Sequence, residues 1–162
     1  KVFETLNASF APLYGFAELT PKQIDYYVRI YIPMLRLNLI TLIVREEDDT
    51  VVGFGISLPS LSHALQKAKG RLFPFGFIPL LKAMHSKTKI VDLYLMGILP
   101  EYQNKGVNAL LFCDLIPEYI KLGAEYAESN IELETNTAVQ AQWDYFKREH
   151  HKTRRVFIKK LI

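Results

Sequence analysis

Hydrophobic and polar residues follow one another along this chain with a period that changes several times, and each change predicts a new element. Residues 1–16 are half apolar and predict a helix that ends before Pro12. The run from Thr20 to Gln23 has the signature of a helix start, with a capping Thr, a Pro at the first helical position and a Gln three residues after the cap. This second helix is expected to reach about Tyr31, because Pro33 cannot donate a backbone hydrogen bond.

The next pattern is a pair of aliphatic, β-branched segments. Leu39–Arg45 and Val51–Leu58 flank the acidic run 46–50, which predicts an antiparallel hairpin with a solvated loop tip. The acidic run lacks the ligand spacing of a metal site. Gly53 and Gly55 lie on one strand and indicate either a close backbone approach or a bulge.

Residues 60–87 predict two short helices around the aromatic segment 70–76. Two interpretations of this segment are open: a loop that covers a cleft, or a surface loop anchored in the core by Phe73, Phe75 and Phe77. The sequence favours the second.

A nearly continuous apolar run, Lys89–Ile98, predicts a strand in the interior of the sheet. A long helix is expected from about Gly106 to Leu122, bent by Pro117 and stopped by Gly123. Its apolar stripe at helical spacing consists of Val107, Leu110, Leu111, Leu115, Ile116 and Tyr119.

The last third of the chain adds a strand, a helix and a strand to the expected order. Glu128–Glu134 alternates strictly between polar and apolar positions and predicts a strand. Asn136 is placed to cap a helix through about His150, and Arg154–Ile162 predicts a basic terminal strand. Strand-helix-strand units after an antiparallel hairpin imply an α/β domain with a mixed sheet.

Composition narrows the class of protein. Apolar residues are 49% and charged residues 23% of the 162 residues, as in a folded globular domain, and the net charge is only +3. The basic excess gathers near the end of the chain and is too mild to indicate a nucleic-acid partner. The one cysteine, Cys113, fits a reducing compartment, so we expect a cytoplasmic protein.

Two further absences concern membranes and processing. No run approaches the roughly 18 consecutive apolar residues of a membrane span, so no membrane partner is expected. The chain begins Lys1-Val-Phe-Glu, without Met and without the layout of a signal peptide. We therefore expect a part of a longer protein.

The segment Ile98–Ala109 joins the interior strand to the long helix and has the features of a phosphate cradle. A turn that opens a helix concentrates free backbone N–H groups and the positive end of the helix dipole. A Walker loop is excluded because Gly-x4-Gly-Lys-Ser/Thr is missing. A dinucleotide fingerprint is excluded because Gly106 is the one glycine in the segment.

The spacing Gln103-x-x-Gly106-x-Asn108 resembles the Arg/Gln-x-x-Gly-x-Gly/Ala motif of the GNAT superfamily of acetyl-CoA-dependent N-acetyltransferases. The order of elements over residues 39–162 resembles that superfamily too. The resemblance implies a single α/β domain over residues 1–162, with a GNAT-type mixed, mostly antiparallel sheet, a splay between its central strands and helices on both faces. The chain also resembles the C-terminal half of larger bacterial GNAT-like proteins. This resemblance implies that the first strand of the GNAT fold lies upstream of Lys1.

The resemblance implies acetyl-CoA as cosubstrate. Backbone groups of the strand end would meet the pantetheine arm, backbone N–H groups of the loop and helix start would wrap the pyrophosphate, and an asparagine after the next strand would contact the arm. The residues at these positions are Met96, Gly97, Ile98, Gln103, Asn104, Lys105, Gly106, Val107, Asn108, Ala109 and Asn136.

The chain departs from the family pattern at two positions. Asn108 replaces a small residue, so its side chain either crowds the phosphates or contributes a hydrogen bond. Trp143 stands where many members carry a tyrosine general acid, and an indole cannot deliver a proton to a thiolate. Tyr145 lies about 200° further around the helix and is a poor substitute. We expect Trp143, Tyr145 and Phe146 in the core.

Acetyl transfer needs a base for the amine proton, and the strand before the cradle offers candidates. Asp92, Tyr94 and Met96 are expected on one face of this strand. Asp92 and Tyr94 are the catalytic candidates. Asp92 stands where the histone-acetylating branch of the superfamily carries a glutamate base, and would act through a water. The alternative is a solvated or ion-paired Asp92.

The acidic positions 128, 132 and 134 either line the cleft and attract a cationic amine or pair with the basic terminal strand, and pairing is favoured. His150 and His151 are expected at a solvated helix end, and no metal site is expected.

The sequence thus favours an N-acetyltransferase that acts on a primary amine of a small molecule or peptide. The alternative is a GNAT-fold module without catalysis that binds coenzyme A or a partner within a larger protein. An upstream domain and an oligomer are both left open.

Overall fold

The computed structural model of the chain describes residues 1–160, apart from the side chain of Met34, and contains two compact units. The first unit is Lys1–Ile131, and the second begins at Glu132. The helices of the first unit are α1 (Val2–Phe10), α2 (Pro21–Tyr31), α3 (Ser62–Lys67), α4 (Phe77–His85) and α5 (Val107–Leu122). Its strands are β1 (Ile40–Arg45), β2 (Thr50–Pro59), β3 (Ile90–Ile98) and β4 (Tyr126–Ser129), and its 3₁₀ turns are η1 (Ile32–Met34), η2 (Leu37–Leu39) and η3 (Pro100–Tyr102). The second unit holds α6 (Thr137–Gln142) and η4 (Trp143–Tyr145).

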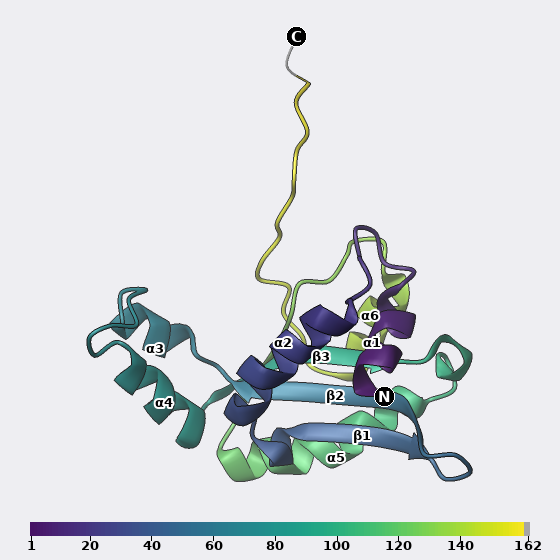
Figure 1. Cartoon of the computed structure of the whole chain (residues 1–162), viewed down its shortest axis with the longest axis horizontal. Helices are drawn as coiled ribbons and strands as arrows, with labels where there is room; N and C mark the ends of the chain where they lie inside the picture. Colours follow the sequence, from purple (N-terminus) through teal and green to yellow (C-terminus); the bar gives the residue numbers. More distant parts are fainter. Residues whose placement is uncertain (161–162) are drawn as a thin grey trace. The chain divides into compact units, whose positions relative to one another are not determined.

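The four strands of the first unit form one sheet in the order β1-β2-β3-β4 (Figure 1). The pairs β1–β2 and β2–β3 are antiparallel, and β3–β4 is parallel. β3 therefore lies inside the sheet, as its continuous apolar sequence predicts. The mixed, mostly antiparallel sheet with helices on both faces confirms the expected fold class.

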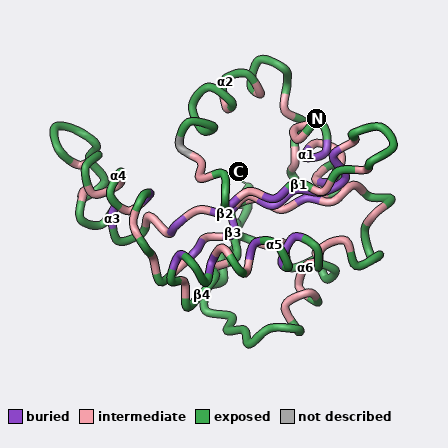
Figure 2. The backbone as a smooth tube through the Cα atoms, turned by 90° about the horizontal axis from the view of Figure 1, so that it is seen from below, coloured by how far each residue is buried: buried purple, intermediate pink, exposed green. Residues whose placement is uncertain are grey.

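Helices cover both faces of this sheet. α5 packs on one face, against β1 and β2, while α1 packs on the other, over β2 and β3 (Figure 1). A Cβ placed on Gly55 would lie 3.0 Å from Leu115 of α5, whereas one placed on Gly97 would lie 2.5 Å from the Ser9 hydroxyl of α1. In Figure 2 the buried positions gather along the strands and the inner side of α5. The largest fully buried side chains include Leu39, Phe54, Val91, Leu111 and Leu115.

The buried hydroxyl groups of Ser57, Tyr119 and Thr5 are hydrogen-bonded in this core. The hydroxyls of Ser57 on β2 and Tyr119 on α5 are 2.5 Å apart, and burial raises the pKa of Tyr119 although this bond lowers it. On the opposite face the Thr5 hydroxyl donates to the carbonyl of Val51, at 2.6 Å. These bonds tie α5 and α1 to β2, because a buried hydroxyl without a partner is costly.

The predicted helix boundaries in the first unit are confirmed. Thr20 and Gln23 form a complete capping box at the start of α2, which ends at Tyr31. α5 ends at Leu122, followed by Gly123 with φ 87°, and contains Pro117. No helix among residues 1–160 is both long and apolar enough to span a bilayer.

From β4 onward, the elements of the structure differ in length from the predicted ones. The predicted strand Glu128–Glu134 is limited to Tyr126–Ser129, because β4 pairs with β3 only as far as Leu93 and Ser129. Strict alternation therefore continues in the sequence beyond the point where a partner strand is available.

The last predicted helix and strand also differ from the structure. α6 is capped by Asn136, as predicted, but it ends at Gln142 and gives way to the turn η4 instead of continuing to His150. Residues 154–160 of the predicted terminal strand form no strand, and residues 161–162 lie outside the described part of the chain. A strand needs a partner for its backbone groups, and alternation alone does not supply one.

The two short helices expected in residues 60–87 are confirmed as α3 and α4, but the anchoring of their loop in the core is wrong. Phe73 and Phe75 are 81% and 72% exposed, and Phe77 is exposed as well.

Candidate functional site

The predicted cradle lies between the end of β3 and the start of α5. Asn104 and Gly106 both have positive φ, 57° and 77°, so the chain reverses twice before Val107 begins the helix. Such alternation turns successive N–H groups toward one side of a loop. The N–H of Gln103 donates to Pro100 and that of Ala109 to Gly106. The five N–H groups between them, from Asn104 to Asn108, meet no acceptor within hydrogen-bonding geometry among residues 1–160.

Side chains on both sides of the cradle hold its backbone. The Gln103 amide donates to the carbonyl of Ile98, at 3.0 Å. The Tyr102 hydroxyl accepts from Arg45 of β1, at 3.0 Å, and the ammonium of Lys105 lies 5.8 Å from the Tyr102 ring centre. Arg45 in turn donates two bonds to Asp48, at 2.8 and 2.6 Å. These bonds fix the loop against the β1–β2 hairpin without using the N–H groups of Asn104–Asn108.

The contact between Arg45 and Tyr102 could not be predicted from the cradle motif, because the two residues are 57 positions apart. The bonds to Arg45 and Thr50 hold the pKa of Asp48 well below its usual range, and the bond to Asp48 is the main reason that the pKa of Arg45 is raised.

β3 is open on one side next to the cradle. Its ladder with β4 ends at Leu93, and the Asn130 amide then donates to the carbonyl of Tyr94, at 3.1 Å. From Leu95 to Ile98, β3 has β2 on one side and no described strand on the other. The fold class predicted a splay at this point, and a strand edge without a strand partner can bond an extended amide chain.

A bulge at Tyr94 changes the faces of β3. Ile56 of β2 is opposite Leu95 and Ser57 is opposite Leu93, so Tyr94 is the extra residue. Leu93 follows Ser57 onto the α5 face, and Met96 lies on that face too, near the Cβ position of Gly55. Asp92 therefore lies on the opposite face. The prediction that Asp92, Tyr94 and Met96 share a face is wrong, because a bulge shifts the alternation by one residue.

The two catalytic candidates lie close to this bulge. Asp92 is the register partner of Glu128 on β4, so two carboxylates stand side by side on the face away from α5. The Oδ1 atom of Asp92 is buried, and Glu128 is half-buried. Tyr94 is exposed. The alternation in the sequence placed Glu128 among the acidic positions 128, 132 and 134, but it did not predict the pairing of Glu128 with Asp92.

Asn136 and Trp143 belong to the second unit. The Asn136 side chain caps α6 by accepting from the N–H of Val139, at 3.4 Å. The Trp143 indole N–H donates to Glu132, at 2.7 Å. Tyr145 is 89% exposed and Phe146 is exposed, so the expectation that both lie in the core is wrong. Arg155 and Glu134 form one exposed contact of the predicted acidic–basic pairing, at 3.8 Å.

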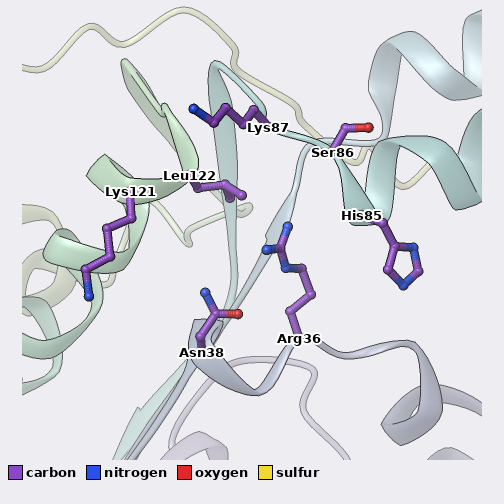
Figure 3. A pocket seen from close by; sticks show the side chains of 7 residues that line it. All are labelled: Arg36, Asn38, His85, Ser86, Lys87, Lys121 and Leu122. Atoms are coloured by element: carbon purple, nitrogen blue, oxygen red, sulfur yellow. The ribbon is translucent and has the colours of Figure 1, made fainter.

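A pocket with several basic side chains lies at the C-terminal end of α5, away from the cradle. Arg36, Asn38, His85, Ser86, Lys87, Lys121 and Leu122 line a pocket of about 210 Å³ (Figure 3). The Arg36 Nη1 is buried and has no hydrogen-bond acceptor among the described residues. In Figure 3 the His85 ring and the Lys121 amine point away from the Arg36 guanidinium, and Lys121 pairs with Glu118. α5 is about 24 Å long, so this pocket is separate from the cradle.

Among residues 1–160, no group of three or more His, Cys, Asp or Glu side chains is placed so that it could hold a metal ion.

Several solved structures with a similar arrangement are acetyltransferases. A probable acetyltransferase matches 98% of the chain with a TM-score of 0.58 and 15% identity, over 91% of its own length. An acetyltransferase of Trypanosoma brucei matches 97% of the chain and 90% of its own, with a TM-score of 0.55 and 12% identity. The chain has the GNAT acetyltransferase fold. A third GNAT-fold match, AAC(6')-Iy in complex with the bisubstrate analogue CoA-S-monomethyl-acetylneamine, has a TM-score of 0.53 and 14% identity over 98% of the chain and 92% of its own.

Sequence comparison places the chain beside two larger curated proteins. Protein YghO of Escherichia coli is 28% identical over 123 residues, which are 73% of this chain and 32% of YghO. The bacterial ceramide synthase of Caulobacter vibrioides is 26% identical over 163 residues, 98% of this chain and 42% of the synthase. The GNAT-fold chain thus spans less than half the length of either relative. No model of a known protein family matches it.

Proposed function

We propose that this chain binds acetyl-CoA and transfers its acetyl group to a primary amine of a small molecule or peptide. The observation that carries the proposal is the row of five backbone N–H groups, Asn104–Asn108, at the start of α5 and beside the open edge of β3. A pyrophosphate needs several donors at one point, and an amide-containing arm needs a strand edge.

The residues present suit coenzyme A. Asn104–Asn108 would hold the pyrophosphate through the main chain, so the side chain of Asn108 leaves the donors intact. Met96, Gly97 and Ile98 would meet the pantetheine arm. Gly106 suits its place through its positive φ of 77°. Bound acetyl-CoA supplies a thioester carbonyl that a neutral amine can attack.

The neighbouring carboxylates of Asp92 and Glu128 would attract and deprotonate that amine. Asp92 and Glu128 attract a cationic ammonium group electrostatically and can accept its proton, directly or through a water. When the amine nitrogen bonds to the carbonyl carbon, the carbon–sulfur bond breaks, the amine proton passes to this base, and coenzyme A leaves as a thiolate that takes a proton from water. Tyr94, exposed at the bulge, is the second catalytic candidate.

A module without catalysis is the alternative function. The observation that favours it is Trp143, at the position where many family members carry a tyrosine acid, with its N–H already donated to Glu132. An indole has no proton to give to a leaving thiolate. Coenzyme A would then bind without turnover.

Incubation of the chain with acetyl-CoA and a panel of primary amines separates these functions. Products are identified by mass spectrometry, because the exposed Cys113 would react with thiol reagents. The panel includes lipid amines and longer acyl-CoA thioesters, since one relative is named a ceramide synthase. Transfer that falls in Asp92→Asn and persists in the control Asp25→Asn supports the enzyme, binding without transfer supports the module, and absence of binding overturns both.

A further inference from the structure

Residues 60–87, the α3–α4 hairpin, carry an unusual amount of exposed apolar surface. The loop and the outer sides of both helices expose seven large apolar side chains: Leu65, Leu72, Phe73, Phe75, Phe77, Ile78 and Leu81. Figure 2 shows most of α3, α4 and their loop as exposed, at a distance from the buried strands. Patches of this kind mark contact with a partner or a membrane.

This apolar loop is folded. The N–H of Phe77 donates to Leu72 and that of Arg71 to Ala68, at 3.0 and 2.9 Å. Gly76 packs so closely on the carbonyl of Arg71 that a Cβ there would lie 1.6 Å from the oxygen. The buried Ala64 and Met84 lie on the inner sides of α3 and α4. The loop's own backbone bonds and packing thus support the exposed rings of Phe73 and Phe75.

The charge of the hairpin has one sign. It contains five Lys and Arg residues and no Asp or Glu, whereas acidic residues outnumber basic ones in the rest of the chain. The five are exposed and have no ion-pair partner among residues 1–160: Lys67, Lys69, Arg71, Lys82 and Lys87. Lys67 and Arg71 border the same hollow of about 420 Å³ as Phe73 and Phe75.

We propose that the α3–α4 hairpin docks on the surface of an anionic lipid bilayer. Exposed aromatic and aliphatic side chains surrounded by Lys and Arg are the composition that binds the interface, the apolar groups entering the headgroup boundary and the cations meeting anionic headgroups. A protein groove would supply acidic side chains in one arrangement, whereas a bilayer satisfies all five cations without a fixed geometry. The bilayer is therefore the occupant that charge complementarity favours.

Docking in this way orients the first unit. The hairpin connects the end of β2 to the start of β3, while the cradle follows the end of β3, about 26 Å further along the strand. Figure 1 shows the hairpin and the loop before α5 at opposite ends of the sheet. The cradle would then face water, and Asp92 would lie toward the membrane end of β3. The docking stands or falls independently of coenzyme A binding.

Co-sedimentation with vesicles tests the proposal. The 162-residue chain is mixed with phosphatidylcholine vesicles and with vesicles that contain about 30% phosphatidylglycerol. We expect the chain to pellet with the anionic vesicles, at least tenfold more strongly than with neutral ones, and to be released by 0.5 M salt.

Two matched pairs of variants locate the contact. The triple change Lys67→Glu, Lys69→Glu and Arg71→Glu is expected to lower the partition coefficient at least tenfold, whereas Lys147→Glu, Lys159→Glu and Lys160→Glu, with the same charge change, retains it. The change Phe73→Ser with Phe75→Ser is expected to weaken binding similarly, whereas Tyr14→Ser with Leu37→Ser, also at exposed positions, has no effect. Circular dichroism checks that each variant is folded.

Three results would overturn the proposal. The first is equal binding to both kinds of vesicle or to neither. The second is loss of binding in the C-terminal variant and not in the hairpin variant. The third is a concentration-dependent dimer, abolished by Phe73→Ser with Phe75→Ser, in a chain that does not pellet with vesicles.

Discussion

Gly106 and Gly15 adopt nearly the same left-handed backbone conformation but lie in different parts of the first unit. Their φ angles are 77° and 78°, and a Cβ on either would meet no heavy atom within 4 Å. An alanine is strained by about 1 kcal/mol there. Only Gly106 lies beside the N–H groups of Asn104–Asn108.

We predict that Gly106→Ala and Gly15→Ala lose similar stability, about 1 kcal/mol each, while only Gly106→Ala binds acetyl-CoA at least tenfold more weakly. Urea unfolding and calorimetry measure the two effects. Equal affinity of the two variants for acetyl-CoA would remove Gly106 from the site.

Asp48 offers a test by pH at the hairpin that braces the cradle. Its carboxylate accepts from the Arg45 guanidinium and from Thr50, and these bonds depress its pKa. A carboxylate with a depressed pKa stabilises the fold at pH values above the ordinary Asp pKa of about 3.9. That stabilisation disappears as the pH falls from this value toward the folded pKa.

The expected result is an NMR titration in which Asp48 ionises well below the ordinary value and returns toward it in Arg45→Gln. An ordinary pKa of Asp48 in the unchanged chain would show that the Arg45–Asp48 pair does not persist in solution.

Among the elements, α5 and β3 were the most predictable from sequence. Their apolar patterns are long, and Pro100, Gly106 and Gly123 mark the boundaries. The bulge at Tyr94 was not predictable, because the polar and apolar pattern of β3 continues through it. β4 and α6 were overestimated, since their length depends on partners that local sequence does not reveal. The carboxylate pair of Asp92 and Glu128 follows from strand register, which is likewise non-local.

The position of α5 on the sheet yields a stability prediction. Leu115 is fully buried against β2, whereas Ile120 of the same helix is 68% exposed. We expect Leu115→Ala to lower the free energy of unfolding by about 2–5 kcal/mol and Ile120→Ala by less than about 0.5 kcal/mol. Chemical denaturation compares them, and a similar small loss for both would contradict the packing of α5.

At the scale of the whole molecule, the chain combines a GNAT-fold sheet with the α3–α4 hairpin, whose helices the sequence predicted and whose exposed loop it did not. The sequence expectation of no membrane partner rested on spans alone. Phe73 and Phe75 lie outside the core, in the loop between α3 and α4, next to the exposed apolar side chains of both helices. Cradle and hairpin then occupy opposite ends of one sheet, which suits a water-soluble cosubstrate at one end and a lipid surface at the other.

Limited proteolysis tests which segments are folded. Residues 147–160 contain no helix or strand, whereas the loop between α3 and α4 is held by its own backbone bonds. Trypsin is expected to cut first at the basic residues between Lys147 and Lys160. Mass spectrometry identifies the fragments, and earlier cuts after Lys67, Lys69 or Arg71 would show that the hairpin loop opens readily.

We propose that the backbone of Asn104–Asn108 holds the pyrophosphate of acetyl-CoA. The most direct measurement is a titration of the ¹⁵N-labelled chain with acetyl-CoA, followed through its amide NMR signals. We predict that the amides of Asn104–Asn108 shift most, followed by those of Leu95–Ile98, and that Gly106→Ala weakens the response. Unchanged signals from Asn104 to Asn108 at millimolar acetyl-CoA, or shifts confined to the pocket around Arg36, would contradict it.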